Sequence, residues 1–387
     1  MKKTTLHSVH ISRGAKMVPF GDYEMPLHYG SIQAEHIAVR ENAGLFDVSH
    51  MGLLYIEGKE AGAFVQHVTT NDVYKLSAGK TQYSTITNED GCLLDDILVY
   101  CFLSEKQYLL VVNSANTQKI EDWLCRKKKE EGLRAKKYSS VYIQNASEYL
   151  DILALQGPDA KEILSSALGI FESRIPSPYH FSRDESLIPS SYPFIELPPI
   201  GKKIMISATG YTGERGYELY LPTENTRPVW DELVAAGARP AGLGARDSLR
   251  LEMGYCLYGQ DIDESISPLE AGLGWIVKED TEFIGATALA KQRKEGIKKK
   301  LFGFIAEGRG IPRSGAEIIS VQDSRPLGKI TSGGYSPTLK QGIGMGYLNL
   351  DQNQHEIGTQ VYISMPPRKI LARVSAFPFV KTKKGKA

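Results

Sequence analysis

Residues 91–112 read GCLLDDILVYCFLSEKQYLLVV and contain two short apolar runs, at 97–102 and 108–112. Short runs rich in aliphatic, β-branched and aromatic residues are typical of β-strands. Because such runs do not alternate regularly with helical segments along the chain, we expect an α+β fold with mainly antiparallel sheets. Further strand candidates lie at 53–56, 149–155, 203–207 and 217–221.

Helix candidates lie between these strands and carry apolar residues at helical spacing. The first begins after Ser31, a residue type that caps helix N-termini, and ends before Gly44. The others cover about 116–128, the segment after Pro158, 227–236 and the segment from about Ala245.

From about residue 299 the sequence becomes strand-like throughout. Turn residues such as Gly333-Gly334 and Pro366-Pro367 separate the runs, and helix signals are scarce. We expect a small closed β module here, with its boundary near the charged residues 290–298. A Pro- and Ser-rich stretch at 174–202 predicts a long surface loop, with a lid as the alternative. The strand-like runs are 301–305, 316–320, 329–331, 343–348, 361–363 and 370–374.

Bulk composition limits the possible functions. The chain has 387 residues, with 46 Lys and Arg, 45 Asp and Glu, and a formal net charge of +1. A nearly neutral chain is a poor general binder of a phosphate backbone, so we expect no nucleic-acid partner. Four cysteines without C-x-x-C spacing favour a reducing compartment, and the histidines show no metal-ligand spacing. No apolar run reaches the roughly 20 residues that span a bilayer, so we expect a cytoplasmic protein without metal or membrane.

The first candidate site is the pair Asp95-Asp96 at the start of an apolar strand. Neighbouring strand residues point to opposite faces, so one carboxylate can cap a turn while the other enters a cavity. A carboxylate in such a place can hold or move a proton on a substrate nitrogen. Turn capping by both residues is the alternative.

Two further candidates are glycine-rich. In Thr209–Glu218 (TGYTGERGYE), Glu218 follows a tight turn and sits in an apolar strand, where it either meets a ligand or is exposed on a hairpin. In 242–247 (GLGARD), Arg246 opens a helix and either binds a carboxylate or pairs with Asp247 on the surface. Tyr83, Asn113, Tyr258 and Trp275 are polar or aromatic residues at element boundaries, and none is diagnostic alone.

Taken together, these segments resemble the glycine cleavage T-protein family. They occur in the family's order and cover nearly the whole chain, which makes the set much more specific than any single motif. The segments are 17–20 (MVPF), 25–29 (MPLHY), 44–52 (GLFDVSHMG), 70–72 (TND), 82–84 (QYS), 95–96 (DD), 111–113 (VVN), 155–158 (LQGP), 210–214 (GYTGE), 242–251 (GLGARDSLRL), 257–261 (LYGQD), Trp275 and 331–333 (TSG).

The resemblance implies a three-domain cloverleaf around a central folate cavity. Residues 1–52 and 142–292 would form a discontinuous folate-binding domain, and 53–141 an inserted α+β folate-binding domain. Residues 293–387 would form a C-terminal β-barrel.

It also implies a reaction. An aminomethyl group on the lipoyl arm of H-protein is transferred to tetrahydrofolate, giving 5,10-methylenetetrahydrofolate, ammonia and dihydrolipoyl H-protein. Tetrahydrofolate would be a co-substrate, with no metal, and the enzyme a monomer. Asp96 resembles the family's catalytic carboxylate, and Glu218 resembles its pterin-recognising carboxylate. The remaining folate-site positions would be Arg246, Tyr83, Asn113, Tyr211, Met51 and Trp275.

Some features depart from the family pattern. Cys92 replaces a usual glycine before the Asp pair, and the tail after Phe379 is basic. A non-enzymatic folate-binding relative in iron–sulphur assembly is one alternative, but its Lys-Gly before the cysteine is absent from 253–260 (MGYCLYGQ). A folate-dependent demethylase is the other. Basic clusters at 126–137, 298–300 and 381–386 are either solvated ends or a docking patch for an acidic carrier protein.

Overall fold

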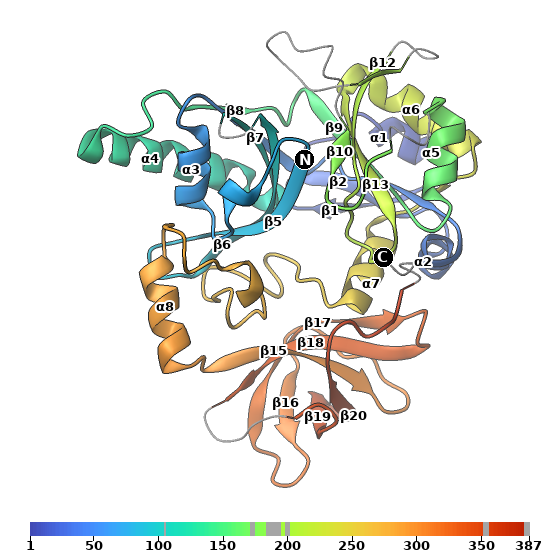
Figure 1. The fold of residues 1–387 in the computed structure, drawn as a ribbon. Helices are drawn as coiled ribbons and strands as arrows, with labels where there is room; N and C mark the ends of the chain where they lie inside the picture. Colours follow the sequence, from blue (N-terminus) through green and yellow to red (C-terminus); the bar gives the residue numbers. More distant parts are fainter. Residues whose placement is uncertain (104–105, 171–174, 183–194, 198–201, 351–355, 383–387) are drawn as a thin grey trace.

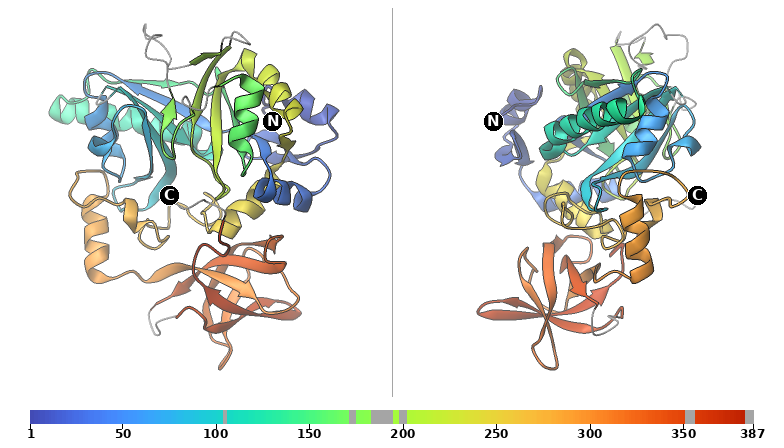
Figure 2. Two further views of the ribbon diagram at one scale, coloured as in Figure 1. Left: turned by 45° about the vertical axis from the view of Figure 1, so that its right-hand side comes forward. Right: turned by 90° about the vertical axis from the view of Figure 1, so that its left-hand side faces the viewer.

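Three lobes make up the molecule (Figures 1 and 2). Two of them contain open sheets and lie next to each other, and the third is a barrel beneath them. The computed structural model describes residues 1–103, 106–170, 175–182, 195–197, 202–350 and 356–382.

The first lobe contains a sheet of seven described strands. The β3–β14 pair is parallel, and the other described pairs of this sheet are antiparallel. Trp230 and Leu233 of one covering helix pack into a core with Leu155 and Leu219 of the sheet. The strand order is β10 (Phe181–Ser182), β12 (Lys202–Ser207), β13 (Gly216–Pro222), β9 (Leu150–Gln156), β3 (Gly44–Asp47) and β14 (Arg239–Pro240), with β11 (Ile195–Leu197) paired to β12. The packed helices are α1 (His7–Ser12), α5 (Ala160–Leu168) and α6 (Thr223–Ala235).

The second lobe contains an antiparallel sheet of five described strands. Phe64 and Trp123 from its two covering helices pack against one face, together with Ile97 and Leu110 of the sheet. The strand order is β5 (Lys80–Thr87), β6 (Leu93–Leu103), β7 (Gln107–Val112), β4 (Gly52–Glu57) and β8 (Tyr142–Asn145). The helices are α3 (Ala61–Val68) and α4 (Thr117–Ala135), with the short turns η1 (Val73–Lys75) and η2 (Ser114–Asn116) beside them.

A separate apolar core joins the two sheets. Phe46 and Tyr220 of the first sheet lie in one cluster with Tyr100, Phe102 and Val111 of the second. All five side chains are buried. The core therefore fixes β6 and β13, which carry the predicted carboxylates, relative to each other.

Helices α2 (Ile32–Glu41) and α7 (Leu243–Met253) lie beside the hairpin of β1 (Lys16–Phe20) and β2 (Tyr23–His28). The Ser31 hydroxyl accepts a hydrogen bond from the Ala34 N–H at 3.3 Å, which confirms the predicted N-cap. Gly242, at the N-cap of α7, donates its N–H to Glu35 at 3.0 Å. A Cβ atom at this position would lie 2.4 Å from the Leu27 carbonyl oxygen, so the close approach requires glycine.

The third lobe is a closed antiparallel barrel, joined to the rest through α8 (Ala286–Glu295). Phe304, Ile318 and Ile363 are fully buried in its core. The strand order is β15 (Lys299–Ala306), β18 (Gln341–Asn349), β17 (Pro326–Ser336), β16 (Glu317–Ser320), β19 (Gln360–Met365) and β20 (Arg368–Ser375).

Buried ion pairs connect α7 to its surroundings and to the barrel. Arg250 binds Asp261 at 2.6 Å and donates to the barrel residue Ser332 at 2.8 Å. Arg40 of α2 binds Glu252 of α7 at 2.8 Å. We call Arg40, Arg250, Glu252 and Asp261 the junction cluster; its side chains are all buried.

The α+β class, the mainly antiparallel sheets and the closed C-terminal barrel are confirmed. Every predicted helix and strand region has a counterpart, although α6 begins at Thr223 rather than 227 and α4 extends to Ala135. The predicted 174–202 loop falls largely outside the described residues, and its described parts include β10 and β11. The expected barrel boundary at 290–298 overlaps the end of α8. The helices and strands that the sequence patterns missed include α1, α3, α8, β1, β2, β3, β5, β8 and β14.

Candidate functional site

The two aspartates of β6 form the polar centre between the lobes. Asp95 is fully buried, whereas Asp96 keeps some accessible surface. Asn113, which follows β7, bridges them: its side-chain amide donates to Asp95 Oδ1 and to Asp96 Oδ1, both at 2.8 Å. The hydroxyl of Tyr83 on β5 donates to Asp96 Oδ2 at 2.8 Å. The structure thus brings together three predicted site residues, Asp96, Asn113 and Tyr83.

Asp95 serves a different purpose from Asp96. Its carboxylate accepts the backbone N–H of Asn113 at 3.0 Å and the side-chain amide of Asn116 at 2.7 Å. It therefore ties the end of β7 and the start of α4 to β6. Asp96 has only the Tyr83 and Asn113 side chains as partners among the described residues, so its carboxylate remains available to a ligand.

Burial raises the pKa of both carboxylates. The pKa of Asp95 rises to about 8, first because of burial and then because of the nearby charge of Asp96. Burial also raises the pKa of Asp96, although the hydrogen bonds from Tyr83 and Asn113 oppose this rise. The pair therefore retains a proton near neutral pH, a property useful for proton transfer.

Glu218 lies on β13, close enough to Arg246 for the charge of that arginine to act on its pKa. Its side chain is buried, with only 8% of the residue exposed, so the exposed-hairpin alternative is wrong. The Thr209 hydroxyl bonds Glu218 Oε2, and Oε1 has no hydrogen-bond partner among the described residues. Burial raises the pKa of Glu218, while Thr209 and the charge of Arg246 oppose the rise.

Arg246 lies in the first turns of α7, over the ring of Tyr211. Its guanidinium carbon is 4.7 Å from the ring centroid, within cation–π range. In the part of the chain that the structure describes, the guanidinium makes no hydrogen bond, and Asp247 pairs with Arg250 instead. The alternative of an Arg246–Asp247 surface pair is therefore wrong. Burial lowers the pKa of Arg246, and the charges of Tyr211 and Glu218 counteract it.

Electrostatic interactions link the residues around Asp96 to those around Arg246. The charges of Asp96 and Arg246 both act on the pKa of Tyr211, and Tyr211 acts on that of Tyr83. Asp96, Tyr83, Tyr211 and Arg246 are all partly exposed although they lie in the interior. Partly exposed polar groups that face one another in an interior are expected of a ligand site.

Met51 and Trp275 lie at the edges of this group. Met51 follows β3 and packs partly buried against the core between the sheets. Trp275 is 61% exposed and stacks on Tyr83, with ring centroids 6.1 Å apart. Tyr258, also noted in the sequence, donates to the Leu93 carbonyl at 3.2 Å and so supports the start of β6 rather than facing the carboxylates directly.

Sequence patterns did not single out three hydroxyl groups behind Glu218. Thr209, Tyr100 and Tyr220 are buried and bonded to one another between the two sheets. Tyr100 and Tyr220 look like ordinary strand residues in the sequence. The available signal was a tyrosine at an interior position of each of two strands. The packing of those strands against each other, from two different sheets, was not visible in the sequence.

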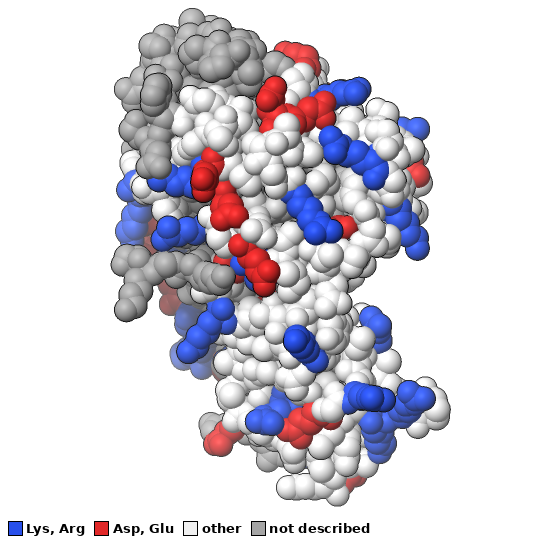
Figure 3. Space-filling view, turned by 90° about the vertical axis from the view of Figure 1, so that its right-hand side faces the viewer, with Lys and Arg blue, Asp and Glu red and all other residues white. Residues whose placement is uncertain are grey.

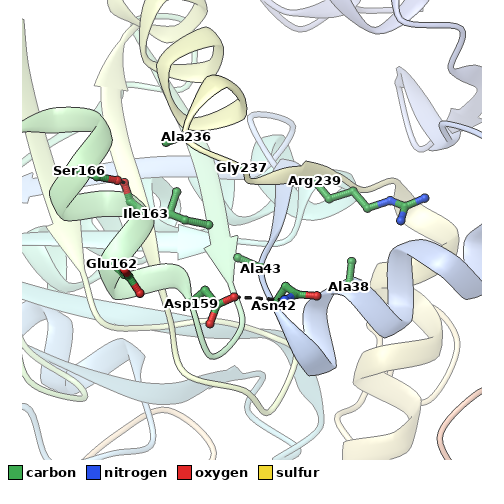
Figure 4. A pocket seen from close by; sticks show the side chains of 10 residues that line it. All are labelled: Ala38, Asn42, Ala43, Asp159, Glu162, Ile163, Ser166, Ala236, Gly237 and Arg239. Carbon is green, nitrogen blue, oxygen red and sulfur yellow. Dashed lines mark hydrogen bonds between the residues drawn. The ribbon is translucent and has the colours of Figure 1, made fainter.

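Elsewhere on the molecule, a hollow of about 450 Å³ lies between α2, α5 and the turn before β14 (Figure 4). Asn42 and Asp159 hydrogen-bond across it, and Arg239 lies at its side. None of its lining residues belongs to the group around Asp96. Among the described residues of the face shown in Figure 3, lysines and arginines are interspersed with carboxylates.

Among the residues with assigned positions, no three or more His, Cys, Asp or Glu side chains are grouped so that they could hold a metal ion. No helix within the described ranges is both long and apolar enough to cross a bilayer.

Comparison with known proteins gives a consistent result. Residues 6–281 match the family model described as the GCVT N-terminal domain, and 299–381 match the glycine cleavage T-protein C-terminal barrel domain. An aminomethyltransferase of Halothermothrix orenii is 43% identical over 385 residues, covering 98% of this chain and 100% of the relative. One of Bacteroides thetaiotaomicron is 44% identical over 388 residues, with the same coverage of both chains.

A solved structure agrees with these relatives over the whole fold. The crystal structure of glycine cleavage system aminomethyltransferase T from Bartonella henselae superposes with a TM-score of 0.86 at 30% identity, covering 98% of each chain. Matches that span both open-sheet lobes and the barrel confirm the resemblance drawn from the sequence motifs. This chain belongs to the glycine cleavage T-protein family of aminomethyltransferases.

Proposed function

We propose that this protein transfers the aminomethyl-derived one-carbon unit of lipoyl-bound H-protein to tetrahydrofolate. The products are 5,10-methylenetetrahydrofolate, ammonia and dihydrolipoyl H-protein. The observation that carries the proposal is the availability of three polar groups in one interior site. These are the Asp96 carboxylate, Glu218 Oε1 and the Arg246 guanidinium, which lack saturating partners within the described residues.

The polar groups suit two parts of a folate, the amino-pyrimidinone edge of the pterin and the reacting nitrogens. The amino-pyrimidinone edge of the pterin presents adjacent N–H donors, which a carboxylate such as Glu218 accepts. Arg246 and Tyr211 provide a cation and a ring at the same end of the site. Asp96, held by Tyr83 and Asn113, is the carboxylate for the reacting nitrogens. Met51 and Trp275 complete the proposed contacts.

The chemistry requires proton movement but no change of oxidation state. Two N–H bonds of tetrahydrofolate are replaced by two C–N bonds to the same carbon. The donor's C–N and C–S bonds break, and the two protons leave on ammonia and on the dihydrolipoyl thiol. A carboxylate whose pKa is raised by burial, as for Asp96, can accept and return a proton during these steps.

The proposal includes several points of biological setting. Tetrahydrofolate acts as a co-substrate and no metal takes part. The enzyme works as a cytoplasmic monomer, in the reducing compartment that its four free thiols favour. Its domains follow the division into 1–52 with 142–292, 53–141 and 293–387.

Basic residues near the site attract an acidic H-protein, so raising the ionic strength from low to moderate should slow turnover with H-protein.

The decisive assay measures methylenetetrahydrofolate formation from aminomethyl-loaded H-protein, with tetrahydrofolate binding followed in parallel. We expect Asp96→Asn to lower kcat by about 10²–10⁴-fold while tetrahydrofolate still binds. Asp159→Asn, in the hollow of Figure 4, is the matched control and should retain activity.

Three results would oppose the proposal. Full activity in Asp96→Asn would remove Asp96 from the mechanism. Folate binding without turnover in the unmodified protein would indicate the non-enzymatic branch. Turnover of methylated amines in place of aminomethyl-loaded H-protein would indicate a demethylase.

A further inference from the structure

Glu218 is connected to a chain of buried hydroxyl groups. Thr209, in the turn after β12, bonds Glu218 Oε2 and lies 3.1 Å from the hydroxyl oxygen of Tyr100 on β6. The Tyr220 hydroxyl on β13 donates to the Tyr100 hydroxyl at 2.9 Å. The chain therefore runs Tyr220–Tyr100–Thr209–Glu218 and crosses from one sheet to the other and back.

Burial makes this arrangement well defined. Tyr100 is 0% exposed, Tyr220 1% and Thr209 7%, so water does not compete for these hydroxyls. The rings of Tyr100 and Tyr220 contact each other edge to face, with centroids 5.5 Å apart and planes at 69°. Side chains packed in this way have little freedom to choose other partners.

The number of hydrogens sets the direction of the chain. A hydroxyl has one hydrogen to donate, so a Thr209 hydroxyl that donates to the Glu218 carboxylate must accept from its neighbours. Thr209 also lies 3.0 Å from the buried Ser207 hydroxyl, which bonds Tyr100 as well. Tyr100 therefore donates either to Thr209 directly or to Ser207, which passes its own hydrogen to Thr209, and Tyr220 donates to Tyr100. By either route the hydrogens are directed to Thr209 and from there to Glu218, and bonds aligned in this way strengthen one another.

We propose that Tyr220, Tyr100 and Thr209 form a positioning chain that holds Oε2 of Glu218 and leaves Oε1 directed to the ligand. None of the three hydroxyls touches the ligand in this scheme. They act by fixing the rotation of the carboxylate and stabilising its charge, so that it accepts the paired donors of an amino-pyrimidinone. The inference rests on the proposed function, in which Glu218 reads the pterin.

Single substitutions can remove each hydroxyl of the positioning chain with little change in the shape of the side chain. Thr209→Val removes the link to Glu218, Thr209→Ser retains it, and Tyr220→Phe removes the far end. Glu218→Gln serves as the reference for loss of the carboxylate. Binding is measured for tetrahydrofolate and for its 2-desamino analogue, which lacks one of the two donors that the carboxylate accepts.

We expect Thr209→Val to weaken tetrahydrofolate binding by roughly tenfold, because one hydrogen bond to a charged group is lost. The same variant should change the affinity for the 2-desamino analogue much less. Thr209→Ser should bind within about twofold of the unmodified protein, and Tyr220→Phe should lose about two- to fivefold. In turnover, Thr209→Val should raise the KM for tetrahydrofolate with little change in kcat, because Asp96 is untouched.

The possible outcomes distinguish a failure of the positioning chain from a failure of the proposed role of Glu218. If Glu218→Gln leaves tetrahydrofolate binding unchanged, the role of Glu218 itself is wrong, and the chain loses its purpose. If Glu218→Gln weakens binding but Thr209→Val does not, the positioning chain alone is overturned. Equal losses for both ligands in Thr209→Val would show general structural damage and would also overturn it. Tyr220→Phe retains the buried ring and keeps the test available if Thr209→Val fails to fold.

Discussion

Two arginines on the same helix lie in opposite situations. Arg250 binds Asp261, Asp247 and Ser332 in the junction cluster, and every charge there has a partner. Arg246, one turn earlier on α7, is without a hydrogen bond among the described residues and rests on the Tyr211 ring. A buried charge is costly unless it is paired. We infer that Arg250 is placed for the stability of the lobes, and Arg246 for a partner that arrives with the substrate.

The carboxylates of the junction cluster and of the candidate site also differ, in the direction of their pKa shifts. In the junction cluster, the hydrogen bond and charge of His36, then the Ser336 hydroxyl and the charge of Arg40, lower the pKa of Glu252 to about 2 in spite of its burial. Around the site, burial and the Asp96 charge raise the pKa of Asp95 to about 8. Fully paired groups thus favour the charged form, whereas the site holds groups whose charges are not compensated in the free protein.

The largest expected effect concerns the paired arginine. Arg250→Met leaves the buried Asp261 without its cation and should lower the free energy of unfolding by about 3–5 kcal/mol. Denaturant unfolding measures the change. Arg373→Met, which removes a surface pair with Glu307, is the matched control and should cost less than about 1 kcal/mol. A similar small loss in both variants would contradict the contrast between the regions.

Acid should act on the junction cluster through Glu252. Its folded pKa of about 2 lies below its ordinary value of 4.5, so its contribution is present above pH 4.5 and is lost as the pH falls toward 2. The slope is at most about 1.4 kcal/mol per pH unit. Unfolding measured from pH 5 to pH 2.5 should therefore show a flatter decline in Glu252→Gln than in the unmodified protein. Parallel curves would remove Glu252 from the acid response.

The unpaired arginine should matter for binding rather than for folding. Arg246→Met should weaken tetrahydrofolate binding by roughly 10- to 100-fold, because a hydrogen bond to a charged group is lost. Its free energy of unfolding should change by less than about 1 kcal/mol, since no partner is left unpaired. Calorimetric titration and denaturant unfolding give the two values. A large loss of stability with unchanged binding would place Arg246 in the same class as Arg250.

The smallest effect is a change in pH dependence. Asp95 has a raised folded pKa, so the folded state retains a proton that the unfolded state loses, and stability falls as the pH rises toward about 8. Asp96→Asn removes the charge that helps to raise this pKa. The decline in unfolding free energy between pH 6 and pH 8 should then become shallower. An unchanged slope would mean that Asp96 does not influence Asp95.

The sequence predicted the barrel and most strands well, because their apolar runs and turn residues are local signals. It missed β3, whose four residues Gly44–Asp47 are all buried and show no alternation. The resemblance predicted site roles for Asp96, Glu218 and Arg246, and these roles remain predictions. No sequence pattern indicated that Arg250 is paired, because its partner Ser332 is 82 positions away. The partners of a buried charge depend on contacts between lobes that no local pattern records.

The most direct test of this contrast is a crystal structure of the protein with tetrahydrofolate bound. We expect Glu218 Oε1 and Arg246 to gain contacts with the pterin, and Asp96 to lie within hydrogen-bond reach of the reacting nitrogens. Arg250 should keep its bonds to Asp261 and Ser332 unchanged. Tetrahydrofolate bound elsewhere, such as in the hollow beside Arg239, with Arg246 and Glu218 still unpartnered, would contradict the account.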